Sequence, residues 1–141
     1  IGTRFINPGN DGLDLSMGNI HVADSEFARC GDKCLSAGEG VRAVITGSRF
    51  IRGKIGIAVK DRSHVELKNN LFSSNFIAYN SYRKKWRWEK GGEGVIENTQ
   101  FLDSVKADLA GDKYSRVKFI TRLPEDLRVQ GKLAITQSLK E

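Results

Sequence analysis

The sequence is poor in proline and cysteine and has no long apolar run. Only 2 of its 141 residues are proline and only 2 are cysteine, whereas 15 are glycine. Frequent glycine with little proline is typical of short strands joined by many tight turns. No run approaches the roughly 18 apolar residues of a transmembrane helix, so we expect no membrane span. The chain starts at Ile1 without a signal-peptide pattern, which indicates a mature or excised piece of a protein.

The motifs of several enzyme and metal-site classes are also missing. The sequence has no phosphate-binding loop, no Gly-x-Ser-x-Gly elbow and no dinucleotide-binding fingerprint. Cys30 and Cys34 lack the second ligand pair of a zinc site, so we expect two buried thiols, with a disulfide across a turn as the alternative. His21 and His64 fall on outward positions and have no Cys or His partner at ligand spacing. We therefore predict no metal ligands, no catalytic residues and no cofactor.

Phenylalanine marks an internal repeat. The sequence places Phe5, Phe27, Phe50, Phe72 and Phe101 at intervals of 22, 23, 22 and 29 residues. Around each one, apolar and polar residues alternate over short stretches, which is the period of a β-strand. A unit of about 22 residues cannot bury its apolar face alone, but it can do so by stacking on its neighbours. We therefore predict an all-β parallel solenoid of about five coils of ~22 residues.

Aligning the repeats gives four inward columns and one turn position. The phenylalanines form one column, an aromatic stack along the interior. The turn position holds Asp24, Gly47, Asn69 and Asn98, residue types that suit a left-handed backbone conformation. The other predicted columns are Ile20, Ala43, Val65 and Gly94; Val22, Ile45, Leu67 and Ile96; and Leu13, Leu35, Ile57 and Ile77.

Two stretches of the coils resemble a known superfamily. The stretches are Gly31-Asp32-Lys33-Cys34-Leu35-Ser36-Ala37-Gly38-Glu39 and Gly56-Ile57-Ala58-Val59-Lys60-Asp61-Arg62-Ser63-His64-Val65. They are similar to right-handed parallel β-helix proteins of the pectin-lyase-like superfamily, and to β-helix segments of bacterial surface proteins. The resemblance covers about residues 1–119 and implies a right-handed parallel β-helix. Proteins of this kind commonly handle polysaccharides.

The ends of the chain differ from each other. Residues 108–117 match residues 57–65 with a shift of 52, which predicts a fifth coil, and the pattern fades after Pro124. We predict β-helix coils over residues 1–124, with a basic loop inserted at 82–92, and a terminal strand or cap over residues 125–141. The N-terminal end has no comparable cap, so we expect further coils or a stacking partner there.

The insertion carries most of the positive charge. Residues 83–90 contain five Lys or Arg against one Glu, in a chain of net charge +6, and both tryptophans. Indole faces stack on sugar rings and cations pair with carboxylate or sulfate groups, although the same residues could pack on the solenoid or bind nucleic acid or a protein. The candidate ligand-binding residues are Arg83, Lys84, Lys85, Trp86, Arg87 and Trp88.

Glu39 and Asp61 are expected one coil apart on the same edge. Two close carboxylates could bind a cation or perform acid–base chemistry, but charged residues at coil edges are ordinary surface. We interpret the chain as a non-enzymatic module for polysaccharide contact or structural display on an exported, extracellular or cell-surface protein. An acidic polysaccharide is the expected partner and nucleic acid is not. The alternative is a fragment of a polysaccharide lyase or related carbohydrate-active enzyme.

Overall fold

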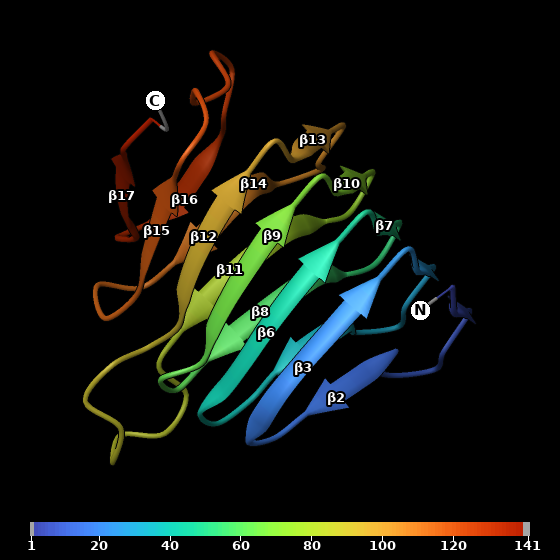
Figure 1. Ribbon diagram of the computed structural model, residues 1–141, viewed down its shortest axis with the longest axis horizontal. Coiled ribbons are helices and arrows are strands. Elements are labelled where there is room, and N and C mark those ends of the chain that lie inside the picture. The colour runs from blue at the N-terminus through green and yellow to red at the C-terminus, as the bar shows by residue number, and fades with distance from the viewer. Residues whose placement is uncertain (1, 140–141) are drawn as a thin grey trace.

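The chain winds into a parallel β-solenoid, seen in the computed structural model, which describes residues 2–139 (Figure 1). Every described secondary-structure element is a strand, and no helix over these residues is long and apolar enough to cross a membrane. The strands are β1 Arg4–Ile6, β2 Leu13–Leu15, β3 Gly18–Ala23, β4 Glu26–Ala28, β5 Lys33–Ala37, β6 Val41–Thr46, β7 Arg49–Ile51, β8 Ile55–Lys60, β9 His64–Lys68, β10 Leu71–Ser73, β11 Ile77–Tyr82, β12 Glu93–Glu97, β13 Gln100–Leu102, β14 Ala107–Gly111, β15 Arg116–Phe119, β16 Val129–Gly131 and β17 Ala134–Gln137.

The first five coils each contribute one strand to each of three sheets, and the last described coil contributes one strand to sheet B and one to sheet C. Sheet A contains β1, β4, β7, β10 and β13; sheet B contains β2, β5, β8, β11, β14 and β16; sheet C contains β3, β6, β9, β12, β15 and β17. All pairings are parallel and join a strand to its equivalent in the next coil. The tail also continues the stack, because β16 pairs with β14 and β17 with β15. The solenoid therefore has about six turns of ~22 residues rather than the five expected.

The phenylalanine column is confirmed. Neighbouring rings from Phe5 through Phe101 stack with centroids 4.8, 4.8, 4.8 and 5.2 Å apart. The spacing matches that of adjacent strands in a sheet, because each ring comes from the same position in successive coils. Phe27, Phe50 and Phe72 are fully buried, so the stack forms one wall of the core.

Two of the other columns are confirmed and one needs correction. The register joins Ile20 to Ala43 and Val22 to Ile45, as expected. In sheet B, however, Ile57 lies opposite Tyr79, and Ile77 lies opposite Ile55. The column therefore runs through Tyr79 instead of Ile77. The glycine at position 94 makes room for the larger ring, because a Cβ there would lie 2.5 Å from the Tyr79 hydroxyl oxygen.

The shared turn position has the backbone conformation that the sequence predicts. Asp24, Gly47, Asn69 and Asn98 all have positive φ, between 46° and 59°. Glycine and the short polar Asn and Asp tolerate this region better than other residues do. The Asn98 side chain also donates a hydrogen bond to Asn69 Oδ1 at 2.7 Å, so the turns are linked along the solenoid.

The expectation of two buried thiols is wrong. Cys30 and Cys34 form a disulfide whose Cα atoms are 5.2 Å apart. The chain turns sharply between β4 and β5, which brings the two side chains together at the corner of sheets A and B. This separation lies within the range of about 4.4–6.8 Å that a disulfide requires. Both cysteines are buried, so the bond lies against the core.

Candidate functional site

The insertion replaces a short turn between sheets B and C. Tyr82 pairs with Lys60 and Glu93 pairs with His64, so residues 83–92 occupy the place that residues 61–63 occupy one coil earlier. The loop is thus seven residues longer than the equivalent turn, and it projects from the corner where β11 and β12 meet (Figure 1). Because the strands on both sides stay in register, the extra length is confined to the loop.

Two aspartates fix the base of the insertion. Asp61, which is only 1% exposed, accepts hydrogen bonds through Oδ1 from the backbone amides of Lys84 at 2.8 Å and Lys85 at 3.1 Å. Asp112, in the following coil, accepts one through Oδ2 from the backbone amide of Arg83 at 2.8 Å. Hydrogen bonds to an ionised acceptor are stronger than neutral ones. The start of the loop is therefore held from the coils on both sides.

A third carboxylate holds the outer part of the insertion. Glu39 forms ion pairs with Lys85, through Oε1, and with Arg87, whose Nη2 lies 3.5 Å from Oε2. Glu39 and Asp61 lie at equivalent corners of successive coils, since Gly40 donates its backbone hydrogen bond to the Asp61 carbonyl. The two carboxylates are adjacent along the solenoid, as expected, and both hold the insertion.

The two tryptophans have different environments. Trp86 is 88% exposed. Trp88 is half-buried, and its indole Nε1 is buried without a hydrogen-bond partner among the described residues. The guanidinium of Arg83 lies 3.7 Å from the centre of the Tyr114 ring and also donates to the Trp88 carbonyl at 3.3 Å. Trp88 and Arg83 therefore pack against the solenoid, whereas Trp86 projects into solvent.

The six candidate residues thus fall into three groups. Arg83 and Trp88 pack against the solenoid, and Lys85 and Arg87 are paired with Glu39. Lys84 and Trp86 are exposed, and the Lys84 side chain forms no ion pair within residues 2–139. The structure brings all six into one loop. That they bind a ligand stays a prediction.

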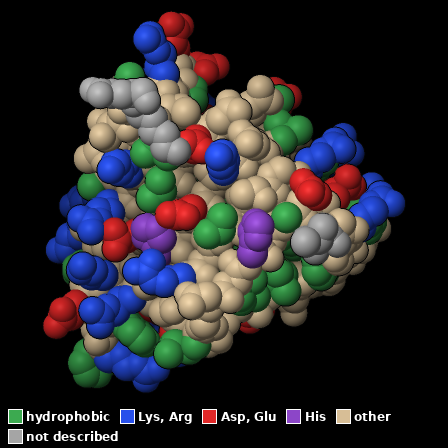
Figure 2. Space-filling view, in the orientation of Figure 1, with side chains coloured by type: hydrophobic (Ala, Val, Ile, Leu, Met, Phe, Trp, Pro, Cys, Tyr) green, Lys and Arg blue, Asp and Glu red, His purple; other side chains and the backbone are tan. Residues whose placement is uncertain are grey.

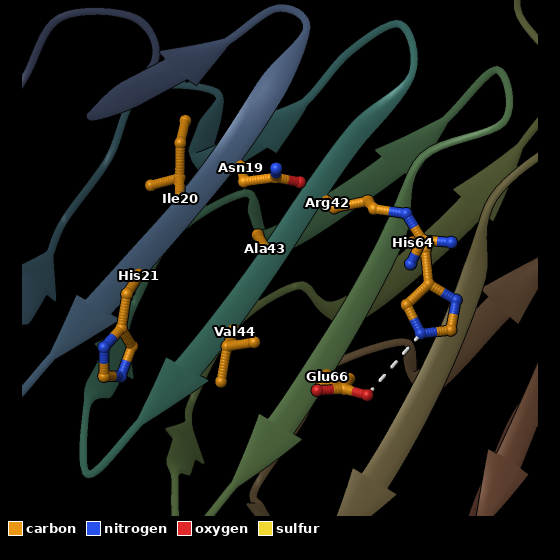
Figure 3. Close-up of a pocket in the computed structure, with 8 residues that line it drawn as sticks. All are labelled: Asn19, Ile20, His21, Arg42, Ala43, Val44, His64 and Glu66. Atoms are coloured by element: carbon orange, nitrogen blue, oxygen red, sulfur yellow. Dashed lines mark ion pairs between the residues drawn. The ribbon is translucent and has the colours of Figure 1, made fainter.

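A hollow that the sequence analysis did not anticipate lies on the outer face of sheet C (Figure 3). Its volume is about 500 Å³, and it spans three neighbouring strands, β3, β6 and β9. Such a volume falls in the range of about 300–1,000 Å³ that small-molecule sites occupy. The lining residues are Asn19, Ile20, His21, Arg42, Ala43, Val44, His64 and Glu66.

The polar groups of the hollow are only partly paired. His64 Nε2 lies 3.9 Å from a Glu66 carboxylate oxygen, and His21 Nε2 lies 3.2 Å from the Thr46 hydroxyl. Arg42 is exposed and lies opposite His64 in the register. It forms no ion pair with any residue of the described range 2–139. Val44, which is 39% exposed, supplies an apolar patch.

The hollow and the insertion adjoin each other. Arg42 follows Glu39, the anchor of Lys85 and Arg87, by three residues, a length of chain that spans at most about 11 Å. Figure 2 shows both histidines, in purple, on the same face as the Lys and Arg side chains that gather on the side where the insertion lies. Arg42, at the hollow, therefore lies close along the chain to the residue that holds the outer part of the insertion.

The outer face of sheet B carries a lysine without an ion pair in the described range. Lys60 is only 8% exposed, and it lies beside Tyr82 in the register. Burial lowers the pKa of Lys60, and the positive charges of Lys33 and Lys84 lower it further. The pKa of Tyr82 is raised, again chiefly by burial. This face therefore buries a cation that forms no ion pair with any residue in the described range.

No group of three or more His, Cys, Asp or Glu side chains within residues 2–139 could hold a metal ion. Comparison of the chain with protein-family models, with curated proteins and with solved structures finds no match in any of the three.

Proposed function

We propose that the chain is a non-enzymatic β-helix module that contacts an acidic polysaccharide through its insertion, residues 82–92. The observation that carries this proposal is the 88% exposure of Trp86 on a loop whose base is fixed by Asp61 and Asp112. A large aromatic side chain left in water on an anchored loop is not explained by packing. Because the loop is already ordered, binding through it avoids part of the entropy loss that a flexible loop would suffer.

The chemistry around Trp86 suits an acidic glycan. An indole offers a broad apolar face for a sugar ring, and Lys84, on the same loop, is exposed and forms no ion pair with any residue in 2–139. Lys85 and Arg87 add two cations that share a single carboxylate, Glu39. Surface ion pairs of this kind are weak, so an anionic polymer can replace Glu39 as their partner.

We place this module in an exported or cell-surface protein, and we relate it to the pectin-lyase-like β-helices. The disulfide between Cys30 and Cys34 supports an oxidising compartment. The relation to that superfamily is supported by the coil sequences that build the solenoid. The alternative, a fragment of a polysaccharide lyase, gains no support from Glu39 and Asp61, because both carboxylates hold the loop.

Binding to immobilised acidic and neutral polysaccharides tests the proposal. The wild-type protein should bind acidic polymers and leave neutral ones unbound. Trp86→Ala should weaken binding by about fivefold or more, because an aromatic contact of about 1 kcal/mol corresponds to that factor. Val105→Ala, at a residue that is 66% exposed, is the matched control and should bind like the wild type. Equal binding by both variants, or release of unsaturated sugar products, would contradict the proposal.

A further inference from the structure

We propose that the hollow on sheet C binds one acidic sugar residue of the polysaccharide that contacts the insertion, and that Arg42 pairs with its carboxylate or sulfate group. This inference rests on the proposed function and adds a second contact site to it. The hollow is formed by β3, β6 and β9, and Figure 3 shows its labelled side chains distributed along these three neighbouring strands.

Arg42 carries a charge that no described residue neutralises. Two other outward cations on sheet C have carboxylate partners, since Arg116 lies 2.7 Å from Glu93 and Lys68 lies 3.4 Å from Glu97. Lys118, outside the hollow, resembles Arg42 in forming no ion pair within residues 2–139. The cross-strand neighbours of Arg42 are instead Asn19 and His64. A guanidinium presents a planar fork of donors that matches a carboxylate or a sulfate. Arg42 forms no ion pair with any described residue, so its guanidinium can pair with the anionic group of a ligand.

Both apolar and hydrogen-bonding groups surround Arg42 in the hollow. Val44 provides an exposed apolar patch, and Asn19, His21, His64 and Glu66 surround it with hydrogen-bonding groups. A sugar ring has the complementary form, with C–H groups on its faces and hydroxyl groups on its rim. A hydroxyl can donate to the Glu66 carboxylate, while an acidic substituent pairs with Arg42. An acidic sugar residue uses every kind of group that the hollow presents.

The charges of the hollow also suit a sugar residue. The hollow holds one carboxylate and one guanidinium. The acidic group of a sugar residue can pair with Arg42 while one of its hydroxyl groups donates to Glu66, whereas the phosphodiester of a nucleic acid has no proton to donate to Glu66. The short distance along the chain between Glu39 and Arg42 lets one oligosaccharide reach both the hollow and the insertion.

The chain offers an unusually clear probe of this site. Its only two histidines, His21 and His64, both line the hollow, so their imidazole NMR signals report on it directly. The protein is titrated with tetrasaccharides of galacturonic acid, of hyaluronan and of alginate, with neutral cellotetraose as the control ligand. Binding at the insertion is followed in parallel by tryptophan fluorescence. An acidic tetrasaccharide should shift both imidazole signals, and cellotetraose should shift neither.

Two variants separate the hollow from general electrostatics. Arg42→Gln should weaken binding of the acidic tetrasaccharide at least about tenfold, since a bidentate charge-assisted contact is lost. Lys118→Gln removes one positive charge from the same sheet face outside the hollow and should change the affinity less than twofold. The thermal midpoint of each variant confirms that it is folded.

The outcomes distinguish this inference from the proposed function. If tryptophan fluorescence reports binding while the imidazole signals stay in place, or if Arg42→Gln and Lys118→Gln behave alike, the hollow is not a site and the proposed function stands. If cellotetraose shifts the imidazole signals as strongly, the ligand is not selected for its charge and the inference fails. If no acidic tetrasaccharide binds at all, both proposals are overturned.

Discussion

The buried carboxylate of Asp61 accepts a hydrogen bond from the backbone amide of Lys84 at 2.8 Å, although the two residues belong to different coils. The same oxygen accepts a second hydrogen bond from Lys85. Asp61 thus holds two consecutive backbone amides of the insertion, next to the Arg83 amide that Asp112 holds. The basic loop is part of the folded structure, and its cations and Trp86 are displayed from a fixed base.

Replacing Asp61 with alanine should therefore loosen the insertion. Hydrogen bonds to a charged group contribute about 1.5–3 kcal/mol, so we expect a loss of unfolding free energy of that order. Asp61→Asn is the matched control, because its amide oxygen can accept the same hydrogen bonds and asparagine tolerates the positive φ of 42° at this position. Urea denaturation measures both. Equal stability of Asp61→Ala and wild type would show that the loop is not anchored here.

Glu39→Gln should release two cations for ligand binding. Lys85 and Arg87 lose their ionised partner, so an acidic polymer no longer competes with Glu39 for them. An exposed ion pair is worth about 0.2–1 kcal/mol, so affinity should rise by up to about fivefold and stability should change little. Calorimetric titration measures the affinity. A variant that binds more weakly than the wild type would indicate that Glu39 itself contacts the ligand.

Phe50 is the middle ring of the phenylalanine column and is fully buried. Phe50→Ala should cost about 3–5 kcal/mol, because large-to-small substitutions in a core lose both the burial and the contacts around the cavity. Thermal or chemical denaturation gives this value. Phe76→Ala, at a ring that is 41% exposed, serves as the control and should cost much less. An unchanged midpoint for Phe50→Ala is incompatible with an interior stack.

Lys60 should destabilise the fold near neutral pH. Burial, with Lys33 and Lys84, lowers its pKa in the folded chain, whereas the unfolded chain has the ordinary value of 10.5. Below the folded pKa the amine is charged in both states, so the cost of burying the charge is fully present. That cost disappears as pH rises from the folded pKa through the unfolded one. The Lys60→Met variant should therefore have a higher melting temperature than the wild type at pH 7. The difference between the two melting temperatures should become smaller towards pH 10.5.

Lys54→Met is the control for that comparison, since Lys54 is exposed. It introduces the same side chain without removing a buried charge, so its midpoint should follow that of the wild type at each pH. A Lys60→Met variant that melts below the wild type at pH 7 would show that Lys60 has a stabilising partner.

The repeat is what made the fold predictable. Five phenylalanines recur at equivalent positions, and polar or glycine residues recur at one turn position. Together they define the length of a coil and the residues that face inward. The register of β11 was predictable only to within two residues, because Ile77 and Tyr79 are both apolar and a slip of two leaves the alternation unchanged. Tyr79 fits in the column because Gly94 has no side chain where the ring lies. The alternation of apolar and polar residues does not reveal this packing. The right-handed winding expected from the resemblance stays a prediction.

The candidate site was predictable in part. The insertion interrupts the repeat and concentrates charge, so its sequence alone identifies it. The sequence alone does not show that Trp88 packs against the solenoid while Trp86 is exposed, because this depends on how the loop folds onto the neighbouring coils. The hollow was missed because its residues come from three coils and occupy outward strand positions, where polar residues are ordinary. The signal that could have found it is the register, which aligns Arg42 with His64 and Val44 with Glu66.

The most direct test of the account is calorimetric titration of an acidic polysaccharide into the wild type and into a chain lacking residues 84–90, each at low and at high salt. The deletion leaves Arg83-Gly91-Gly92, the same length as the turn at residues 61–63. A second variant is used in case the deletion misfolds. It carries Lys84→Gln, Trp86→Ala and Lys90→Gln, and it keeps the loop length and the backbone amides that Asp61 binds. We predict that the wild type binds with an affinity that falls as salt rises, because several ionic contacts release counter-ions, and that both altered proteins fold without binding. Undiminished binding by the folded variants, or wild-type binding that is insensitive to salt, would contradict the account.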